Sequence, residues 1–181
     1  MAKPPPDPAD AEACYQTAMR SLALRWHGEK ELRTKLARRG FDPEAVQSAL
    51  LRLTRERRID DERYARSFAR SRSSKHLGPD RIVRELRGRG VDGLTASRAV
   101  AAAAEEDPGG DHLATLCSKK IRALVARRGL DALLDTRGRN KLIAWLLTQG
   151  YDYGDSSTVV DAQLRQLQRE NDESRVHAQD Q

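Results

Sequence analysis

One pattern of glycines and apolar residues recurs three times along this chain of 181 residues. Each copy holds a glycine, two apolar residues four positions apart, and a second glycine followed by an apolar residue and an aspartate. The copies are Gly28-Leu32-Leu36-Gly40-Phe41-Asp42, Gly78-Ile82-Leu86-Gly90-Val91-Asp92 and Gly138-Leu142-Leu146-Gly150-Tyr151-Asp152. Repeats of this length are typical of stacked supersecondary units, so they argue against a single globular core.

Each copy predicts a helix that ends at its second glycine. The apolar spacing of four places one stripe on a helix of about three turns. The second glycine is predicted to adopt a left-handed conformation at the end of that helix, and the following aspartate to cap the next one. Further amphipathic helices are predicted before these segments, over residues 11–26, 61–75 and 112–128. Each repeat should therefore contain three helices, which gives nine in the chain.

These patterns predict an all-α fold of three tandem three-helix repeats, stacked into an elongated, curved molecule. Aromatic residues make up only 4% of the sequence and charged residues 33%. Such a balance suits short amphipathic helices better than a sheet. The predicted organisation is a disordered, proline-rich leader at 1–10, repeats at 11–58, 59–107 and 108–170, and a disordered polar tail at 171–181.

Positive charge is concentrated in the first two repeats. Residues 20–90 contain 20 Lys and Arg against 10 Asp and Glu, whereas the whole chain has a net charge of +6. Arginine predominates, and its guanidinium group forms bidentate contacts with phosphate or carboxylate. We therefore expect a polyanionic partner, either nucleic acid or an acidic protein surface. The candidate binding residues are Lys35, Arg38, Arg39, Arg52, Arg55, Arg63, Arg66, Arg70, Arg72, Lys75, Arg81, Arg84 and Arg87.

The sequence contains no pattern typical of catalysis or metal binding. The four histidines form no His-x-x-x-His pair and adjoin no nucleophile motif, and no phosphate-binding glycine loop is present. His27 and His76 are expected to be exposed in loops beside the repeat glycines. The acidic cluster at 60–62 is expected to cap a helix rather than to hold a divalent ion. We expect no enzymatic activity, no catalytic residue, no metal and no cofactor.

Two further features concern location. Cys14 and Cys117 are too few and too widely separated for a disulfide framework, which favours reduced thiols in a cytoplasmic protein. The sequence also shows no secretion signal and no membrane-spanning segment. We expect a monomeric, cytoplasmic protein that does not contact membranes.

Three segments resemble the signatures of the RecX family. They are residues 59–65 (IDDERYA), 78–86 (GPDRIVREL) and 31–41 (ELRTKLARRGF). The resemblance covers roughly residues 11–167. It implies tandem three-helix repeats that bind RecA filaments and inhibit the recombinase, ATPase and co-protease activities of RecA, in DNA repair and the SOS response. It also implies contact with single-stranded DNA, made directly or through RecA.

Two other functions stay open at this point. The chain could be a helical-repeat protein that binds nucleic acid and has no RecA partner. The scarcity of aromatic residues argues against base stacking but not against contacts with the phosphate backbone. Alternatively, it could be a structural helical scaffold whose charge only keeps it soluble.

Overall fold

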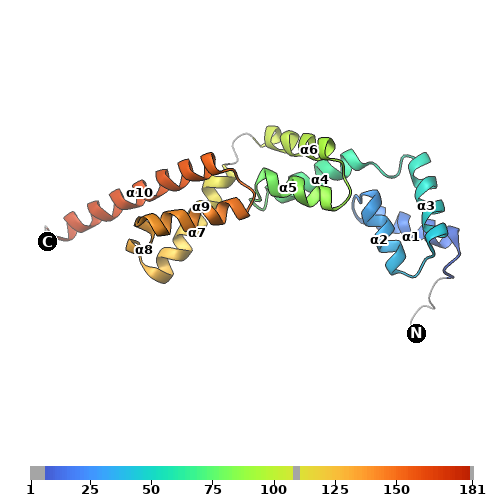
Figure 1. Cartoon of the computed structure of the whole chain (residues 1–181), viewed down its shortest axis with the longest axis horizontal. Coiled ribbons are helices and arrows are strands. Elements are labelled where there is room, and N and C mark those ends of the chain that lie inside the picture. The colour runs from blue at the N-terminus through green and yellow to red at the C-terminus, as the bar shows by residue number, and fades with distance from the viewer. Residues whose placement is uncertain (1–6, 108–110, 180–181) are drawn as a thin grey trace. The chain divides into compact units, whose positions relative to one another are not determined.

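The computed structural model describes residues 7–107 and 111–179, and every regular element in these ranges is a helix. The first predicted repeat contains α1 (Ala11–Leu24), α2 (Glu29–Arg38) and α3 (Pro43–Arg55), and the second contains α4 (Asp61–Ser73), α5 (Pro79–Gly88) and α6 (Gly93–Glu106). The third contains α7 (His112–Arg128), α8 (Asp131–Leu134), α9 (Thr136–Thr148) and α10 (Tyr153–Gln179). The described ranges therefore hold ten helices instead of the nine predicted, because the third repeat has the additional single turn α8 (Figure 1).

Helices α1, α2 and α3 pack around a core of small and branched side chains. Cys14, Ala18, Leu32, Leu36 and Leu53 are fully buried there. These residues lie at helical spacing, so each helix contributes one stripe to the core.

Residues 7–10 differ from the predicted disordered leader. Asp10 caps α1 by accepting a hydrogen bond from the Ala13 amide at 2.8 Å. The carbonyl of Pro8 accepts one from the Asp42 amide at 2.9 Å, which attaches this segment to the start of α3. The remainder of the leader, residues 1–6, lies outside the described residues.

The repeat glycines have the predicted left-handed conformation. The φ angles of Gly40, Gly90 and Gly150 are +92°, +93° and +93°. In all three copies the amide of the residue after the glycine donates to the carbonyl five positions earlier, an arrangement that satisfies orphan carbonyls at a helix end. These bonds are Phe41 to Leu36 at 3.4 Å, Val91 to Leu86 at 3.2 Å and Tyr151 to Leu146 at 3.3 Å. The three sequence copies are therefore structural repeats.

Two of these glycines also allow close packing between repeats, which the sequence did not predict. A Cβ built on Gly90 would lie 2.7 Å from Cβ of Lys30, on α2 of the preceding repeat. A Cβ on Gly150 would overlap the backbone of Arg81, in the first turn of α5. By contrast, a Cβ on Gly40 would meet nothing within 4 Å.

The chain divides into two compact units. One comprises the residues through Ser71 together with Val83–Glu106, and the other comprises Arg72–Ile82 together with the residues from Asp107 onward. The turn at Gly90 packs within the first unit, and the turn at Gly150 packs within the second. In that second unit the amides of Gly78 and Asp80 donate to the carbonyls of Gln149 and Gly150 at 2.9 and 3.1 Å, joining the start of α5 to the end of α9.

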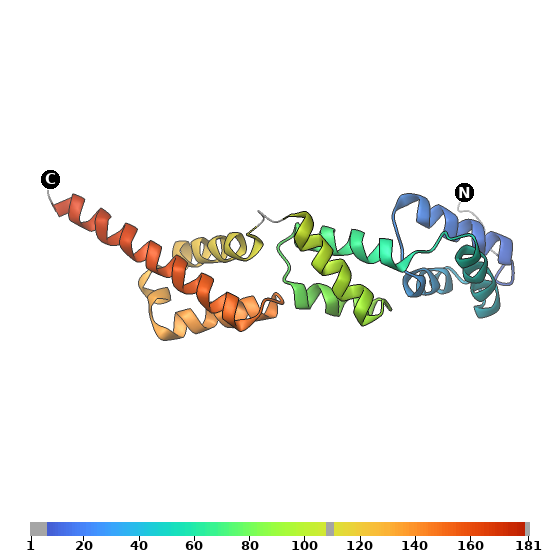
Figure 2. The ribbon, with the colours of Figure 1, turned by 90° about the horizontal axis from the view of Figure 1, so that it is seen from above.

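Helix α10 packs against α7 and α9 within the second unit (Figure 2). Arg139 on α9 forms a bidentate ion pair with Asp161 on α10, at 2.6 and 2.8 Å. The helix continues to Gln179, through most of the segment that the sequence predicted to be a disordered tail. Beyond Gly154 this segment contains neither glycine nor proline, so nothing in it stops helix propagation.

Candidate polyanion-binding site

A groove of about 560 Å³ runs along α2 in the first unit and is closed on one side by the turn after α5. Eight lining residues come from α2 and the turns on either side of it, and two come from the end of α5 in the second repeat. One of the ten residues is an acid, Glu31. Six are cations, namely Arg25, Lys30, Lys35, Arg38, Arg39 and Arg89. The groove is therefore strongly positive and is built by two repeats together.

The acidic residue of the groove, Glu31, already forms an ion pair within the protein. Glu31 pairs with Arg25 and lies 3.3 Å from Nδ1 of His27. Burial by itself would raise the pKa of Glu31, but the hydrogen bond and charge of Arg25 outweigh it, so the pKa of Glu31 is lowered. Glu31 therefore stays ionised and balances Arg25, and the positive charge of the other five cations remains available to a ligand.

Two of the cations are held in place, Lys30 by a contact between the repeats and Arg89 by one within the second repeat. Lys30 donates from Nζ to the carbonyl of Gly88 at 3.3 Å and packs beneath Gly90. The guanidinium of Arg89 lies over the ring of Phe68 on α4, 4.8 Å from its centroid. Such contacts already order the long side chain in the free protein. A ligand that binds it therefore causes a smaller loss of side-chain conformational entropy.

His27 lies at the floor of the groove and is only 2% exposed, although the sequence predicted an exposed loop histidine. Burial, with the charge of Arg25, lowers the pKa of His27, while Glu31 partly opposes this and Lys35 adds to it. The neutral imidazole is therefore the folded form near neutral pH. Its Nδ1 lies 3.3 Å from Oε2 of Glu31 but forms no well-aligned hydrogen bond among the described residues.

We predict that the first unit loses stability as the pH falls below the ordinary imidazole pKa of about 6.5. His27 in the unfolded chain takes up a proton there, whereas folded His27 does so only at lower pH. The unfolded state binds more protons in this window, so acidification favours unfolding. Urea denaturation at pH 7.5 and pH 5.5 measures the effect, and His27→Gln should show a smaller loss. An equal loss in the variant would contradict the assignment.

Only three of the sequence-predicted binding residues line the groove, namely Lys35, Arg38 and Arg39. Five others are exposed and form no ion pair or side-chain hydrogen bond among the described residues: Arg55, Arg66, Lys75, Arg84 and Arg87. The structure does not gather these five into the groove. They carry charge on α3, α4 and α5 and in the turn after α4.

The remaining predicted residues have partners within the protein. Arg52 pairs with Glu12 and Glu56, at 2.7 and 2.9 Å, and its guanidinium lies over the ring of Tyr15. Its charge is therefore balanced by the first repeat itself.

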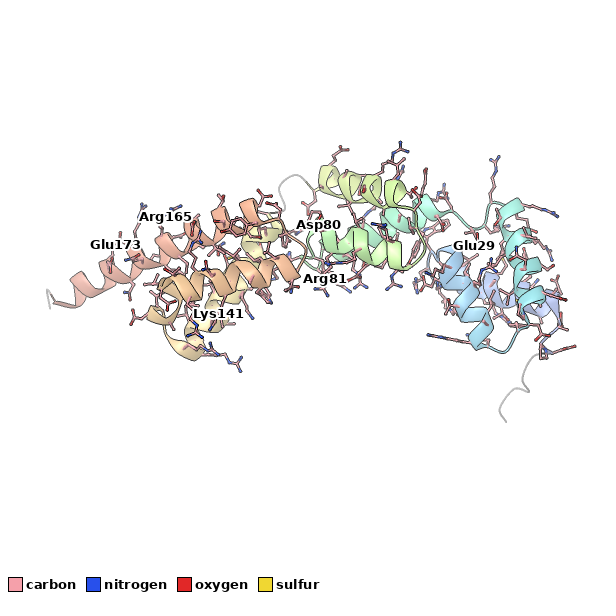
Figure 3. The ribbon with its side chains drawn as sticks, viewed as in Figure 1. Glu29, Asp80, Arg81, Lys141, Arg165 and Glu173 are labelled. Carbon is pink, nitrogen blue, oxygen red and sulfur yellow. The ribbon has the colours of Figure 1, made fainter. Side chains whose placement is uncertain are left out.

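Four more of the predicted residues take part in internal contacts. Arg63 pairs with Asp60 at 3.5 Å, and Arg70 pairs with Glu106 at 3.1 Å. Arg72 is half-buried and has a partner within the chain. Arg81, labelled in Figure 3 in the first turn of α5, donates to Oε1 of Gln149 at 3.0 Å. Two of these contacts, Arg70 to Glu106 and Arg81 to Gln149, join residues of different helices that lie far apart in the sequence.

Asp60 in the second repeat caps its own helix as predicted, whereas Asp61 contacts the start of a helix in the first repeat. Asp60 caps α4 by accepting a hydrogen bond from the Arg63 amide at 2.9 Å. Oδ1 of Asp61 accepts one from the Glu29 amide at 3.3 Å, at the start of α2.

Within the described ranges, no three His, Cys, Asp or Glu side chains are grouped to hold a metal ion. A search of the helices in these ranges likewise finds no candidate membrane span.

Three groove residues, Arg25, Lys30 and Arg89, were not predicted from the charged stripes of single helices. A signal for Arg89 exists in the repeat itself, because Arg39-Gly40 and Arg89-Gly90 occupy equivalent positions fifty residues apart. No such signal exists for Lys30, whose place depends on packing against the next repeat.

Comparison with known proteins identifies the family. Residues 14–53 match the family model described as the first three-helix domain of RecX, and residues 60–100 match that of the second. The regulatory protein RecX of Xanthomonas oryzae pv. oryzae strain MAFF 311018 is 36% identical over 138 residues, which cover 76% of this chain and 80% of that protein. The chain belongs to the RecX family.

Other RecX proteins agree with this assignment. The regulatory protein RecX of Halorhodospira halophila is 48% identical over 87 residues, 48% of this chain and 54% of that protein. The crystal structure of RecX from Lactobacillus salivarius superposes with a TM-score of 0.65 at 24% identity, covering 86% of this chain and 97% of that one. A second RecX crystal structure gives a TM-score of 0.69 at 22% identity, covering 83% and 71%. At these identities the two structures establish the fold alone, and they agree with tandem three-helix domains.

Proposed function

We propose that this chain binds RecA filaments assembled on single-stranded DNA and inhibits the recombinase, ATPase and co-protease activities of RecA. It would thereby modulate DNA repair and the SOS response. Membership of the RecX family supports the proposal. The observation that carries it is the groove in which six cations meet one carboxylate, because both domains matched by the family models contribute to its walls.

The charge of the groove suits a partner with several negative groups. Guanidinium groups form charge-assisted, often bidentate hydrogen bonds with carboxylate and phosphate alike. The groove could therefore receive acidic side chains of RecA protomers or exposed phosphates of the DNA. In both cases much of the affinity is electrostatic and decreases at higher salt concentration.

Exposed cations outside the groove are proposed to contribute further contacts of their own with the filament. Each is free to pair with a partner: Arg55, Arg66, Lys75, Arg84 and Arg87. A filament presents the same acidic or phosphate groups at regular intervals, so several such contacts can form together. We propose that the functional units are the repeats at 11–58, 59–107 and 108–170.

We also propose that the protein acts as a cytoplasmic monomer, without a cofactor, a metal or a catalytic step of its own. Cys14 and Cys117 are free and buried, and burial raises the pKa of each thiol to about 11. A thiol that ionises so weakly is a poor nucleophile and a poor metal ligand. This chemistry supports a structural role for both cysteines.

The proposal predicts binding that depends on the filament. Immobilised single-stranded DNA, with and without RecA and a slowly hydrolysed ATP analogue, is incubated with the chain at a fixed salt concentration. We expect much more of the chain to be retained on RecA filaments than on DNA alone. Equal retention on both would favour a helical-repeat nucleic-acid-binding protein without a RecA partner. No retention on either would favour the structural scaffold.

A further inference from the structure

The third repeat contains a second pocket, separate from the basic groove and within the second unit. It has a volume of about 390 Å³ and lies between α7, α8 and α9. Its apolar lining comprises Leu124, Leu133, Leu142 and Trp145. The wall supplied by Leu133 belongs to α8, the turn that the other two repeats lack.

Close packing fixes α8 against α9. A Cβ added at Gly138 would lie 2.5 Å from the carbonyl oxygen of Ala132 and 2.8 Å from Cα of Leu133. Only glycine permits this approach at the first turn of α9. Asp135 between the two helices accepts a hydrogen bond from the Gly138 amide, which caps α9. The pocket wall is therefore held in place by close packing and by the cap of α9.

The rim of the pocket is positively charged. One carboxylate lines the pocket, that of Asp135. Four cations line it as well, namely Lys120, Arg128, Arg137 and Lys141. Arg128, Arg137 and Lys141 are exposed and have no ion-pair partner among the described residues, and Figure 3 labels Lys141. Nζ of Lys120 lies over the ring of Trp145, 4.7 Å from its centroid. An apolar floor with a cationic rim fits a ligand that carries one apolar group flanked by negative charges.

The apolar side chains of the floor distinguish between two such ligands, a nucleobase and an apolar amino-acid side chain. A nucleobase would bring several ring nitrogens and exocyclic groups, and each of these loses free energy if buried without a partner. The floor consists of hydrocarbon side chains and the indole of Trp145, one face of which is covered by Lys120. The acidic residue that lines the pocket, Asp135, already accepts a hydrogen bond from the Gly138 amide. A leucine or phenylalanine side chain needs no hydrogen bond and is favoured here.

We propose that this pocket binds an acidic peptide segment of a partner protein, with one large apolar side chain inserted between Leu124, Leu133 and Trp145. Carboxylates on either side of that side chain pair with Arg128, Arg137 and Lys141. The site lies in a different repeat from the basic groove and does not depend on the function proposed for the groove. An apolar side chain that fills a pocket inside a polar rim has the arrangement found at binding hot spots.

The test uses the full chain carrying Trp26→Phe, so that Trp145 is the remaining tryptophan and reports on the pocket. Three twelve-residue peptides are titrated: aspartate and glutamate around a central phenylalanine, the same with alanine at the centre, and asparagine and glutamine around phenylalanine. A short oligodeoxythymidine is the fourth probe. We expect a saturable change in Trp145 emission with the first peptide, and binding at least about ten-fold weaker for the other probes.

Matched charge reversals locate the binding. The variant Arg128→Glu/Arg137→Glu/Lys141→Glu should bind the acidic phenylalanine peptide at least about ten-fold more weakly, measured by anisotropy of a labelled peptide. The control Arg122→Glu/Arg127→Glu/Arg169→Glu makes the same change in net charge away from the pocket, and should bind within about two-fold of the parent. Reversal of Arg38 and Arg39 in the groove should also leave this binding unchanged.

Several results would overturn the proposal. They are the absence of saturable binding by the acidic phenylalanine peptide, equal binding of the alanine peptide, and equal weakening by both triple reversals. Tighter binding of the oligonucleotide, lost on reversal of the rim, would assign the pocket to nucleic acid instead. None of these results bears on filament binding through the groove.

Discussion

Reversal of three charges in the groove, Arg38→Glu/Arg39→Glu/Arg89→Glu, is expected to weaken binding to RecA filaments by about 100-fold or more. Each substitution removes a favourable contact with a carboxylate or phosphate and introduces a repulsive one. The three side chains line the same groove, so their effects act on one ligand. Fluorescence anisotropy of a labelled chain titrated with RecA on single-stranded DNA measures the affinity directly.

The matched control is Arg20→Glu/Arg58→Glu/Arg98→Glu. These arginines are exposed, lie in the same unit and do not line the groove. The change in net charge is identical, so a long-range effect of charge would weaken both variants alike. Thermal unfolding by circular dichroism is needed beside the binding data, because Arg89 stacks on Phe68 and Arg38 complements the dipole of α2. Equal weakening by both folded variants would contradict a role for the groove.

Alanine at Gly150 is expected to lower the free energy of unfolding by about 3 kcal/mol or more, against about 1–2 kcal/mol for alanine at Gly40. Both residues have nearly the same left-handed φ, so the cost of that conformation is common to the two substitutions. They differ in their neighbours, because a Cβ at Gly150 overlaps the backbone of Arg81 and one at Gly40 meets open space.

Gly90 provides an intermediate case in the same series. The atoms that its Cβ would meet belong to the side chain of Lys30, which can move at the expense of its bond to the Gly88 carbonyl. We therefore expect the loss of stability to increase from Gly40→Ala to Gly90→Ala to Gly150→Ala, measured by chemical denaturation. Equal losses at Gly40 and Gly150 would show that packing between repeats contributes little.

The parts of the fold that depend on local chemistry were predictable from the sequence. The left-handed turns at Gly40, Gly90 and Gly150 follow from glycine spacing and are confirmed, as is capping by Asp60. The single turn α8 was missed because four residues are too few for helical periodicity to be visible. The extent of α10 was missed because a polar segment without glycine or proline has no clear end signal.

The groove was only partly predictable, because charged stripes were assigned helix by helix. Lys35, Arg38 and Arg39 share one helix and could be recognised together. Arg89 joins them only when the second repeat packs on the first, which no local pattern shows.

Long-range partners explain the other differences between sequence and structure. One partner of Arg52, Glu12, is forty residues away and could not be seen in the local sequence, whereas its other partner, Glu56, is only four residues away. Residues 91–181 contain 12 Lys and Arg against 14 Asp and Glu, so their overall charge did not indicate the four cations that line one pocket in the third repeat.

The most direct test of the central claim is a titration of the DNA-stimulated ATPase of RecA with this chain. RecA is assembled on single-stranded DNA at fixed salt and ATP concentrations, and phosphate release is followed as the chain is added. A chain that engages the filament through its basic groove should reduce the rate saturably, and the Arg38→Glu/Arg39→Glu/Arg89→Glu variant should do so only at much higher concentration. An unchanged ATPase rate, at concentrations where the chain is bound to the DNA or the filament, would contradict the account.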